Sequence, residues 1–141
     1  MSADQEDYRE IEAVLNRYAS ALDKKQYGRL SEVFAPEATA NYVGLAECKG
    51  LDSIVNLVSG VLDRCGQTQH LLGNVQIDVQ GGKATASCYL QAIHVGLGDY
   101  ATQVYTVWGE YRDRLVKTPT GWRISYRELH VLHSQGDIGL A

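Results

Sequence analysis

The hydrophobic periodicity of the chain changes once, near Gly66, and this change limits the possible folds more than any other feature of the sequence. Before Gly66 the apolar residues recur every three or four positions, which is the stripe of an amphipathic helix. After Gly66 they recur every second position, which is typical of strands that bury one face. Helices followed by consecutive strands predict an α+β domain, in which the helices pack on one face of a curved, mainly antiparallel sheet.

Three helical segments are expected in the first half of the chain. The first covers residues 4–24, where acidic residues near its start suit the positive end of the helix dipole. A shorter piece over residues 28–34 ends before the break at Pro36, and a short strand is expected at 39–43. The third helix covers residues 51–63, with its apolar side chains on one side.

Four long strands are expected in the second half, separated by residues that favour turns. Gly81-Gly82 is a strong signal for a two-residue hairpin. The expected strands are residues 67–80, 83–97, 100–118 and 121–133. A chain of 141 residues has the usual size of one domain, so residues 1–141 are expected to form a single domain.

Alternation then assigns a face to each side chain of the strands. On the second long strand, small and apolar side chains share the inward face with His94, and on the third the charged side chains face outward. The inward Ala86, Ala92 and Gly109 leave volume that suits either a ligand cavity or close helix packing.

The composition excludes several classes of function. A net charge of −4 without a cluster of Lys or Arg gives no footprint for nucleic acid. No apolar run approaches the roughly 18 residues of a membrane helix, and the acidic N-terminus differs from a signal peptide, so a cytoplasmic protein is expected. The outward side chains of Val104 and Trp108 would expose apolar surface on a monomer, so a homodimer or homotrimer is expected.

Neither a metal nor a cofactor is expected. Cys48, Cys65 and Cys88 lack the spacing of a disulfide framework or a zinc site, and the sequence has no phosphate-binding glycine loop or dinucleotide fingerprint. His130 and His133 are expected on opposite faces of a strand, at the surface or the rim, without a third ligand. The expected partner is therefore a hydrophobic small molecule rather than a polyanion.

Asp23 and His70 are candidates for acid–base chemistry. Asp23 lies in the last turn of the first helix, where the carbonyl dipoles disfavour a carboxylate by a few tenths to about 1 kcal/mol, so a compensating partner is expected. Either Asp23 is solvated beside lysines, or it turns inward and orients an imidazole by accepting its N–H. Strict alternation turns His70 away from the core, whereas a bulge near Gly73 would turn it inward. The local pattern leaves both arrangements open.

Six short motifs, taken together, carry a family resemblance. They are LNRYASALD at 15–23, LSEVFAPEATA at 30–40, Lys49-Gly50, His70 with Asn74, Gly109-Glu110-Tyr111 and Gly121-Trp122-Arg123-Ile124. Their order and spacing resemble the SnoaL-like branch of the nuclear transport factor 2-like superfamily over nearly the whole chain. Within it, the pattern looks most like scytalone dehydratase, the bile acid dehydratases and hexachlorocyclohexane dehydrochlorinase. The resemblance implies a cone-shaped barrel of three N-terminal helices packed on the curved sheet.

The resemblance also implies site residues. Asp23 and His70 match the Asp-His dyad of these lyases, and Tyr18 matches a pocket tyrosine of the bile acid dehydratases. Tyr42 and His94 are similar to the carbonyl-polarising tyrosine and the second histidine of scytalone dehydratase. These matches predict a catalytic set of His70, Asp23, Tyr18, Tyr42 and His94.

The activity implied by the resemblance is that of a cofactor-free, dehydratase-like lyase or an isomerase, with cyclisation as a further outcome. His70 would remove a proton from a hydrophobic cyclic or polyketide-like molecule, a tyrosine would hold the enolate oxygen, and His94 or its water would protonate the departing hydroxide. Arg127 is the candidate for an arginine that some relatives use. The alternative is a non-catalytic module of the same fold that binds a small molecule or assists assembly.

Overall fold

Four long strands follow Gly66, as the change of period there predicts, and both α-helices lie before it. The computed structural model describes residues 3–140. Its elements are α1 (Ala3–Asp23), the 3-10 helix η1 (Tyr27–Glu32), β1 (Phe34–Tyr42), β2 (Ala46–Lys49), α2 (Leu51–Leu62), β3 (Thr68–Gln80), β4 (Lys83–Val95), the 3-10 helix η2 (Gly98–Tyr100), β5 (Val104–Thr118) and β6 (Gly121–Gln135). Among the described residues, no helix is both long enough and apolar enough to span a membrane.

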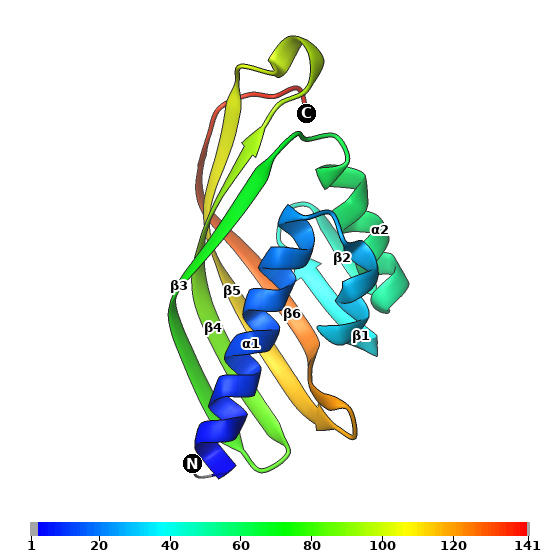
Figure 1. Ribbon diagram of the computed structural model, residues 1–141, viewed down its shortest axis with the longest axis vertical. Coiled ribbons are helices and arrows are strands. Elements are labelled where there is room, and N and C mark those ends of the chain that lie inside the picture. The colour runs from blue at the N-terminus through cyan, green and yellow to red at the C-terminus, as the bar shows by residue number, and fades with distance from the viewer. Residues whose placement is uncertain (1–2, 141) are drawn as a thin grey trace.

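The six strands form one mixed sheet in the order β2-β1-β6-β5-β4-β3. Every neighbouring pair is antiparallel except β1 and β6, which are parallel. The sheet is curved but does not close into a barrel, because β2 and β3 are both edge strands. Helix α1 crosses one face of the sheet and α2 lies beside β1 and β2 (Figure 1). The predicted α+β fold is confirmed, with an open sheet in place of a closed cone.

The core lies between α1 and the concave side of the sheet. The apolar stripe of α1 is buried there against inward side chains of the strands, among them Trp122 and Ile124. Asp7 fixes the other end of α1, since its carboxylate accepts hydrogen bonds from the Trp122 indole at 2.9 Å and from Lys117 at 3.1 Å. Alternate residues of β4 are buried from Ala84 to His94, as the period-two pattern predicts.

The strands differ from the prediction most clearly at β1, β2 and β5, and the other boundaries lie within two residues of those predicted. β1 begins at Phe34 and runs through Pro36, which lies in an irregular stretch where the pairing register with β6 shifts. Proline has no N–H to donate to the ladder, and here no regular ladder bond is required of it. The short strand β2 was not predicted, and β5 begins at Val104 rather than at residue 100 because η2 occupies the intervening turn.

The prediction that His130 and His133 face opposite sides is wrong. β6 carries one extra residue between them, so that His130 pairs with Glu110 and His133 pairs with Trp108 on β5. Glu110 and Trp108 share one face, and an extra residue reverses the alternation of the strand that carries it. Both imidazoles therefore lie on the outer face of the sheet.

Candidate active site

A bulge in β3 decides which way His70 points. The register between β3 and β4 shifts between Gly73 and Gln76, and Asn74 adopts a left-handed backbone with φ of 50°. Upstream of the bulge, His70 pairs with the buried Ala92 and shares its inward face. Of the two arrangements that the sequence left open, the one with a bulge near Gly73 is therefore present. The left-handed backbone lies at Asn74, a residue type that tolerates it better than most.

Asp23 lies behind His70 at the C-terminal end of α1. Its Oδ1 is 2.7 Å from Nδ1 of His70, and its carboxylate also accepts bonds from the His70 backbone N–H at 3.0 Å and from the Thr68 hydroxyl at 3.0 Å. Burial raises the pKa of Asp23, but the hydrogen bonds from His70 and Thr68 outweigh burial and leave the pKa below its ordinary value. These donors compensate for the unfavourable end of the helix dipole.

The carboxylate sets the tautomer of His70. An ionised carboxylate only accepts hydrogen bonds, so Nδ1 of His70 carries the proton and Nε2 carries the free lone pair. Within the described residues, no hydrogen bond engages that Nε2. The imidazole side chain is only 6% exposed, so its rotation is limited by packing as well as by Asp23.

His94 presents a second imidazole beside the first. The two ring centres are 5.7 Å apart, nearly perpendicular, and Nδ1 of His94 donates to the Tyr105 carbonyl at 3.0 Å. Burial lowers the pKa of His94, and the hydrogen bond to Tyr105 only partly offsets this. His94 is therefore neutral at pH 7, with an accepting Nε2 rather than a proton to give.

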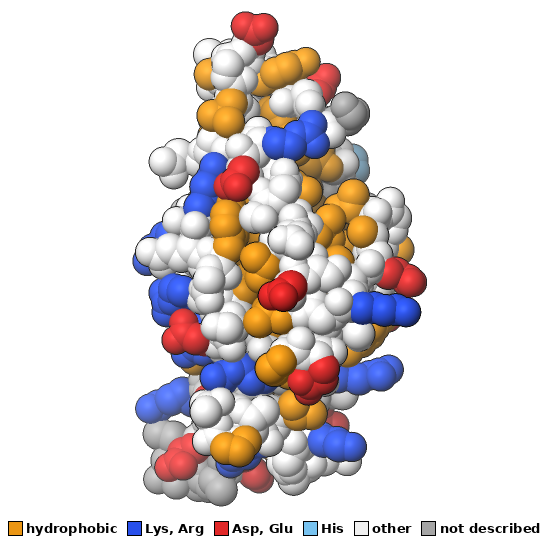
Figure 2. Space-filling model, turned by 90° about the vertical axis from the view of Figure 1, so that its right-hand side faces the viewer, with side chains coloured by type: hydrophobic (Ala, Val, Ile, Leu, Met, Phe, Trp, Pro, Cys, Tyr) orange, Lys and Arg blue, Asp and Glu red, His pale blue; other side chains and the backbone are white. Residues whose placement is uncertain are grey.

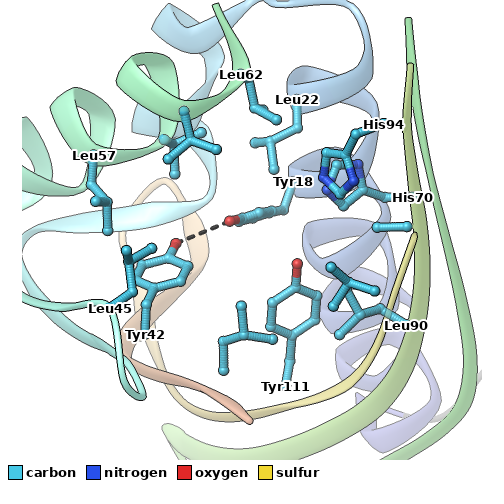
Figure 3. A pocket seen from close by; sticks show the side chains of 15 residues that line it. Tyr18, Leu22, Tyr42, Leu45, Leu57, Leu62, His70, Leu90, His94 and Tyr111 are labelled. Atoms are coloured by element: carbon cyan, nitrogen blue, oxygen red, sulfur yellow. Dashed lines mark hydrogen bonds between the residues drawn. The ribbon is translucent and has the colours of Figure 1, made fainter. Parts of the chain in front are cut away.

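Both imidazoles line a cavity of about 120 Å³ between α1, α2 and the sheet (Figure 3). None of the lining side chains is Asp, Glu, Lys or Arg. They are Tyr18, Leu22, Tyr42, Leu45, Leu57, Val58, Val61, Leu62, His70, Leu90, Ala92, His94, Val107, Tyr111 and Leu129. Of the small inward residues considered above, only Ala92 borders the cavity, whereas Gly109 packs against the His130 carbonyl and the Leu90 side chain.

The cavity opens toward solvent on an apolar side of the molecule. Leu45, in the turn between β1 and β2, lines it and is 64% exposed. On the face that carries α2, hydrophobic side chains gather along the middle and charged side chains lie mainly toward the margins (Figure 2). A neutral ligand would therefore meet apolar side chains before it reaches the histidines.

Three tyrosine hydroxyls border the same cavity. The Tyr18 and Tyr42 hydroxyls are 2.9 Å apart and share one hydrogen bond, so one of their two protons remains free for a ligand. Tyr111 is the third, and its hydroxyl points toward the cavity between Tyr18 and Leu90 (Figure 3). Tyr111 was not predicted as a site residue, although its inward place in the alternation of β5 was a signal for it.

Arg127 does not line the cavity. It is 1% exposed and forms two hydrogen bonds with Asp113, from Nε at 2.7 Å and from Nη2 at 2.8 Å. Its guanidinium carbon lies 4.3 Å from the ring centre of Tyr18 and 3.9 Å from that of Tyr111. The tyrosine rings thus separate this cation from any ligand. No group of three or more His, Cys, Asp or Glu side chains that could bind a metal occurs in residues 3–140.

Helices over a curved, open sheet, with a cavity between the two layers, define a protein of the nuclear transport factor 2-like superfamily. Within that class the chain belongs to the SnoaL-like domain family, whose model matches residues 3–128. An uncharacterized protein of Mycobacterium tuberculosis, Rv2910c, is 33% identical over 123 residues, which cover 86% of this chain and 82% of that protein.

Two solved structures illustrate the range of the fold. One is a protein of Novosphingobium aromaticivorans that is provisionally assigned as a scytalone dehydratase. It is 23% identical to this chain, with a TM-score of 0.85 over 94% of this chain and 88% of its own. The hexachlorocyclohexane dehydrochlorinase of Novosphingobium barchaimii is 17% identical, with a TM-score of 0.79 over 98% of this chain and 92% of its own. At these identities the likeness establishes the fold alone. The structural relatives of the chain nevertheless include an enzyme.

Proposed function

We propose that the protein is a cofactor-free lyase or isomerase in which His70 removes a proton from carbon. The observation that carries this proposal is the arrangement of Asp23 and His70: the carboxylate holds Nδ1, and the free Nε2 belongs to a ring that lines an apolar cavity. A carboxylate behind an imidazole fixes the tautomer and stabilises the imidazolium that forms. A base positioned in this way typically accelerates proton transfer by about 10²- to 10⁴-fold.

The proton would come from a carbon next to a carbonyl group. As it moves to Nε2 of His70, the electron pair of the C–H bond forms an enolate, whose oxygen accepts hydrogen bonds from the tyrosine wall of the cavity. In a dehydration, that electron pair then expels hydroxide from the neighbouring carbon, and the imidazolium of His70 returns the proton to form water. Isomerisation and cyclisation start with the same proton abstraction and differ in the fate of the enolate.

His94 has a different part in this scheme from the one the sequence resemblance implies. Its Nδ1 proton is engaged by the Tyr105 carbonyl, and burial keeps the ring neutral at pH 7. We therefore assign His94 to accepting a hydrogen bond from the leaving hydroxyl group or from a water. The proton that completes the leaving group comes from His70.

The proposed substrate is a neutral, hydrophobic molecule with one ring in the enclosed part of the site. A cavity of about 150 Å³ binds benzene in another protein, and the cavity here has about 120 Å³. A charged substituent that lies away from the tyrosine hydroxyls would lose its hydration without gaining an opposite charge, because no charged side chain lines the site. Larger parts of a polyketide-like substrate would lie at the open end, near Leu45.

Exchange of the α-protons of cyclohexanone with D₂O, followed by NMR, tests the proposal without knowledge of the natural leaving group. We expect exchange above the buffer rate with the native protein and loss of that exchange in His70→Ala. His133→Ala is the matched control, since it removes an exposed imidazole from the outer face. Equal exchange by the native protein and His70→Ala refutes the role of the dyad and favours the non-catalytic binding module.

We also propose that the protein self-associates through the outer face of the sheet. Leu71, Tyr89, Ile93 and Val104 are exposed apolar side chains on strands β3, β4 and β5. By register they lie on the side of the sheet away from the helices, as do Trp108 and His133. Exposed apolar surface of this kind is typical of interfaces between subunits.

A further inference from the structure

The buried pair of Arg127 and Asp113 has no part in the proposed proton transfer. Both side chains are almost completely buried, at 1% and 0% exposure. Burial of two charges costs several kcal/mol per ion before their attraction is counted, and apolar residues of similar volume often fold at least as well. The pair is therefore poorly explained by stability alone.

The contacts of the guanidinium group point toward the cavity wall. Asp113 occupies its Nε and Nη2 edge, and Nη1 is buried without a hydrogen-bond partner in the described residues. The faces of the Tyr18 and Tyr111 rings lie 4.3 and 3.9 Å from the guanidinium carbon, within the range of cation–π attraction. Both rings carry a hydroxyl group that borders the cavity.

A cation behind a phenol ring makes its hydroxyl a stronger hydrogen-bond donor, because it stabilises negative charge on the phenol oxygen. Burial is the largest influence on Tyr111 and raises its pKa, and the Arg127 charge opposes this rise more strongly than Asp113 adds to it. At Tyr18 burial again raises the pKa, and the Arg127 charge is the largest opposing influence. In a site of low dielectric, such charges act more strongly than in water.

We infer that Arg127, held by Asp113, makes the Tyr18 and Tyr111 wall a binding site for a negatively charged oxygen, such as a phenolate or an enolate, without touching the ligand itself. Arg127 is in this sense a positioning residue. The inference supplies the binding site for the enolate of the proposed reaction, and to that extent rests on the proposed function. Binding of a stable phenolate tests it separately from turnover.

The probe is 4-nitrophenol, whose absorption spectrum reports its ionisation. Nitrobenzene is the neutral analogue, which lacks the phenol hydroxyl group. We expect the native protein to bind the ionised form in preference and so to shift the ionisation of bound 4-nitrophenol to lower pH. In the double variant Asp113→Leu/Arg127→Leu, this preference should fall about tenfold or more. Complete removal of an oxyanion donor typically costs about 10²- to 10³-fold, and here both hydroxyls remain. The affinity for nitrobenzene should change by no more than about twofold, since cavity volume is retained.

Both members of the pair are replaced together because Arg127→Leu alone would leave a buried, unpaired carboxylate. The matched control is Arg29→Leu/Glu32→Leu, which removes an exposed ion pair from η1 at the same net charge. If the Asp113/Arg127 variant does not unfold cooperatively, Tyr111→Phe carries the test, and a loss of phenolate preference of about threefold or more is expected from one hydroxyl.

Two results overturn the inference. One is a native protein that does not bind the phenolate in preference to the neutral analogue. The other is a phenolate preference that is unchanged in the double variant. If Tyr111→Phe is used because the double variant does not fold, an unchanged preference in Tyr111→Phe has the same meaning. The two proposals can fail separately. If proton exchange is lost in His70→Ala but the phenolate preference is unchanged in Asp113→Leu/Arg127→Leu, the proposed function is supported and this inference is refuted.

Discussion

Replacement of Asp23 by asparagine keeps the shape of the side chain but replaces one hydrogen-bond-accepting oxygen with an NH₂ group that donates. The carboxylate receives three donors: the Thr68 hydroxyl, the His70 backbone N–H and the protonated Nδ1 of His70. An amide has one accepting oxygen. If that oxygen faces the backbone N–H, the amide NH₂ faces Nδ1 and the Thr68 hydroxyl, both of which can accept a hydrogen bond.

This orientation satisfies every group only when His70 changes its tautomer. Nδ1 then accepts, the proton moves to Nε2, and the ring can no longer act as a base toward the cavity. We therefore expect Asp23→Asn to reduce α-proton exchange by about 10²- to 10⁴-fold. Loss of charge-assisted hydrogen bonds should destabilise the fold by about 1 to 3 kcal/mol, which is less than the roughly 5 to 15 kcal/mol that stabilises a typical domain.

The pH dependence of stability provides a second readout of the same substitution. The pKa of Asp23 lies below its ordinary value of 3.8 in the folded protein. Its ionisation therefore stabilises the fold fully above pH 3.8, and this stabilisation is lost as the pH falls through the lower, folded-state value. The variant should lose that part of the acid sensitivity, which thermal unfolding at several pH values measures.

NMR exchange rates and thermal unfolding are compared for the native protein, Asp23→Asn and the control Asp99→Asn, which alters an exposed carboxylate in η2. The reasoning is refuted if Asp23→Asn is folded and exchanges protons within about threefold of the native rate. In that case the carboxylate is structural, and His70 needs no orienting partner.

Three further expectations follow from the packing. Ala92→Leu should fill the cavity and reduce 4-nitrophenol affinity at least about tenfold, measured by calorimetry, at a cost in stability of about 1 to 3 kcal/mol; an unchanged affinity would place the ligand elsewhere. Asp7 has a pKa lowered by its hydrogen bond to Trp122, so Asp7→Asn should remove stability that is present above pH 3.8 and lost below it, as thermal unfolding at several pH values would record. Tyr89→Lys should convert a dimer or trimer into a monomer in light scattering without changing proton exchange, and a native protein that is already monomeric at micromolar concentration would contradict the proposed interface.

The parts of the fold that depend on local pattern were predictable from sequence. The first helix follows from its apolar stripe, and the inward face of β4, including His94, follows from strict alternation over its whole length. The Gly81-Gly82 hairpin follows from turn chemistry. β2 was not predictable in this way, because a four-residue edge strand has too few positions to establish a period.

The candidate site depends on interruptions of that pattern. In β3 the bulge at Asn74 turns His70 inward. In β6 the register shifts between Arg114 and Leu115 of its partner β5, so that Arg127 pairs with the inward Asp113 although alternation from the buried Ile124 would place Arg127 outside. Each bulge is one residue long. Gly73 makes the bulge in β3 possible without requiring it, and the sequence of β6 beside Ser125 has no such residue.

These interruptions also explain how His70 comes to lie on an otherwise apolar wall and Arg127 behind it. In a strand without a bulge, every second residue faces the core. A polar side chain then faces the core only if its sequence position is in phase with the apolar residues of that strand. A bulge lets the strand keep apolar residues inward on both sides while it brings one polar side chain in between them. His70 enters the wall from β3 and Arg127 lies behind it from β6, each beside a bulge. The base and the buried cation of the proposed site are thus placed by the same structural device, acting on two different strands.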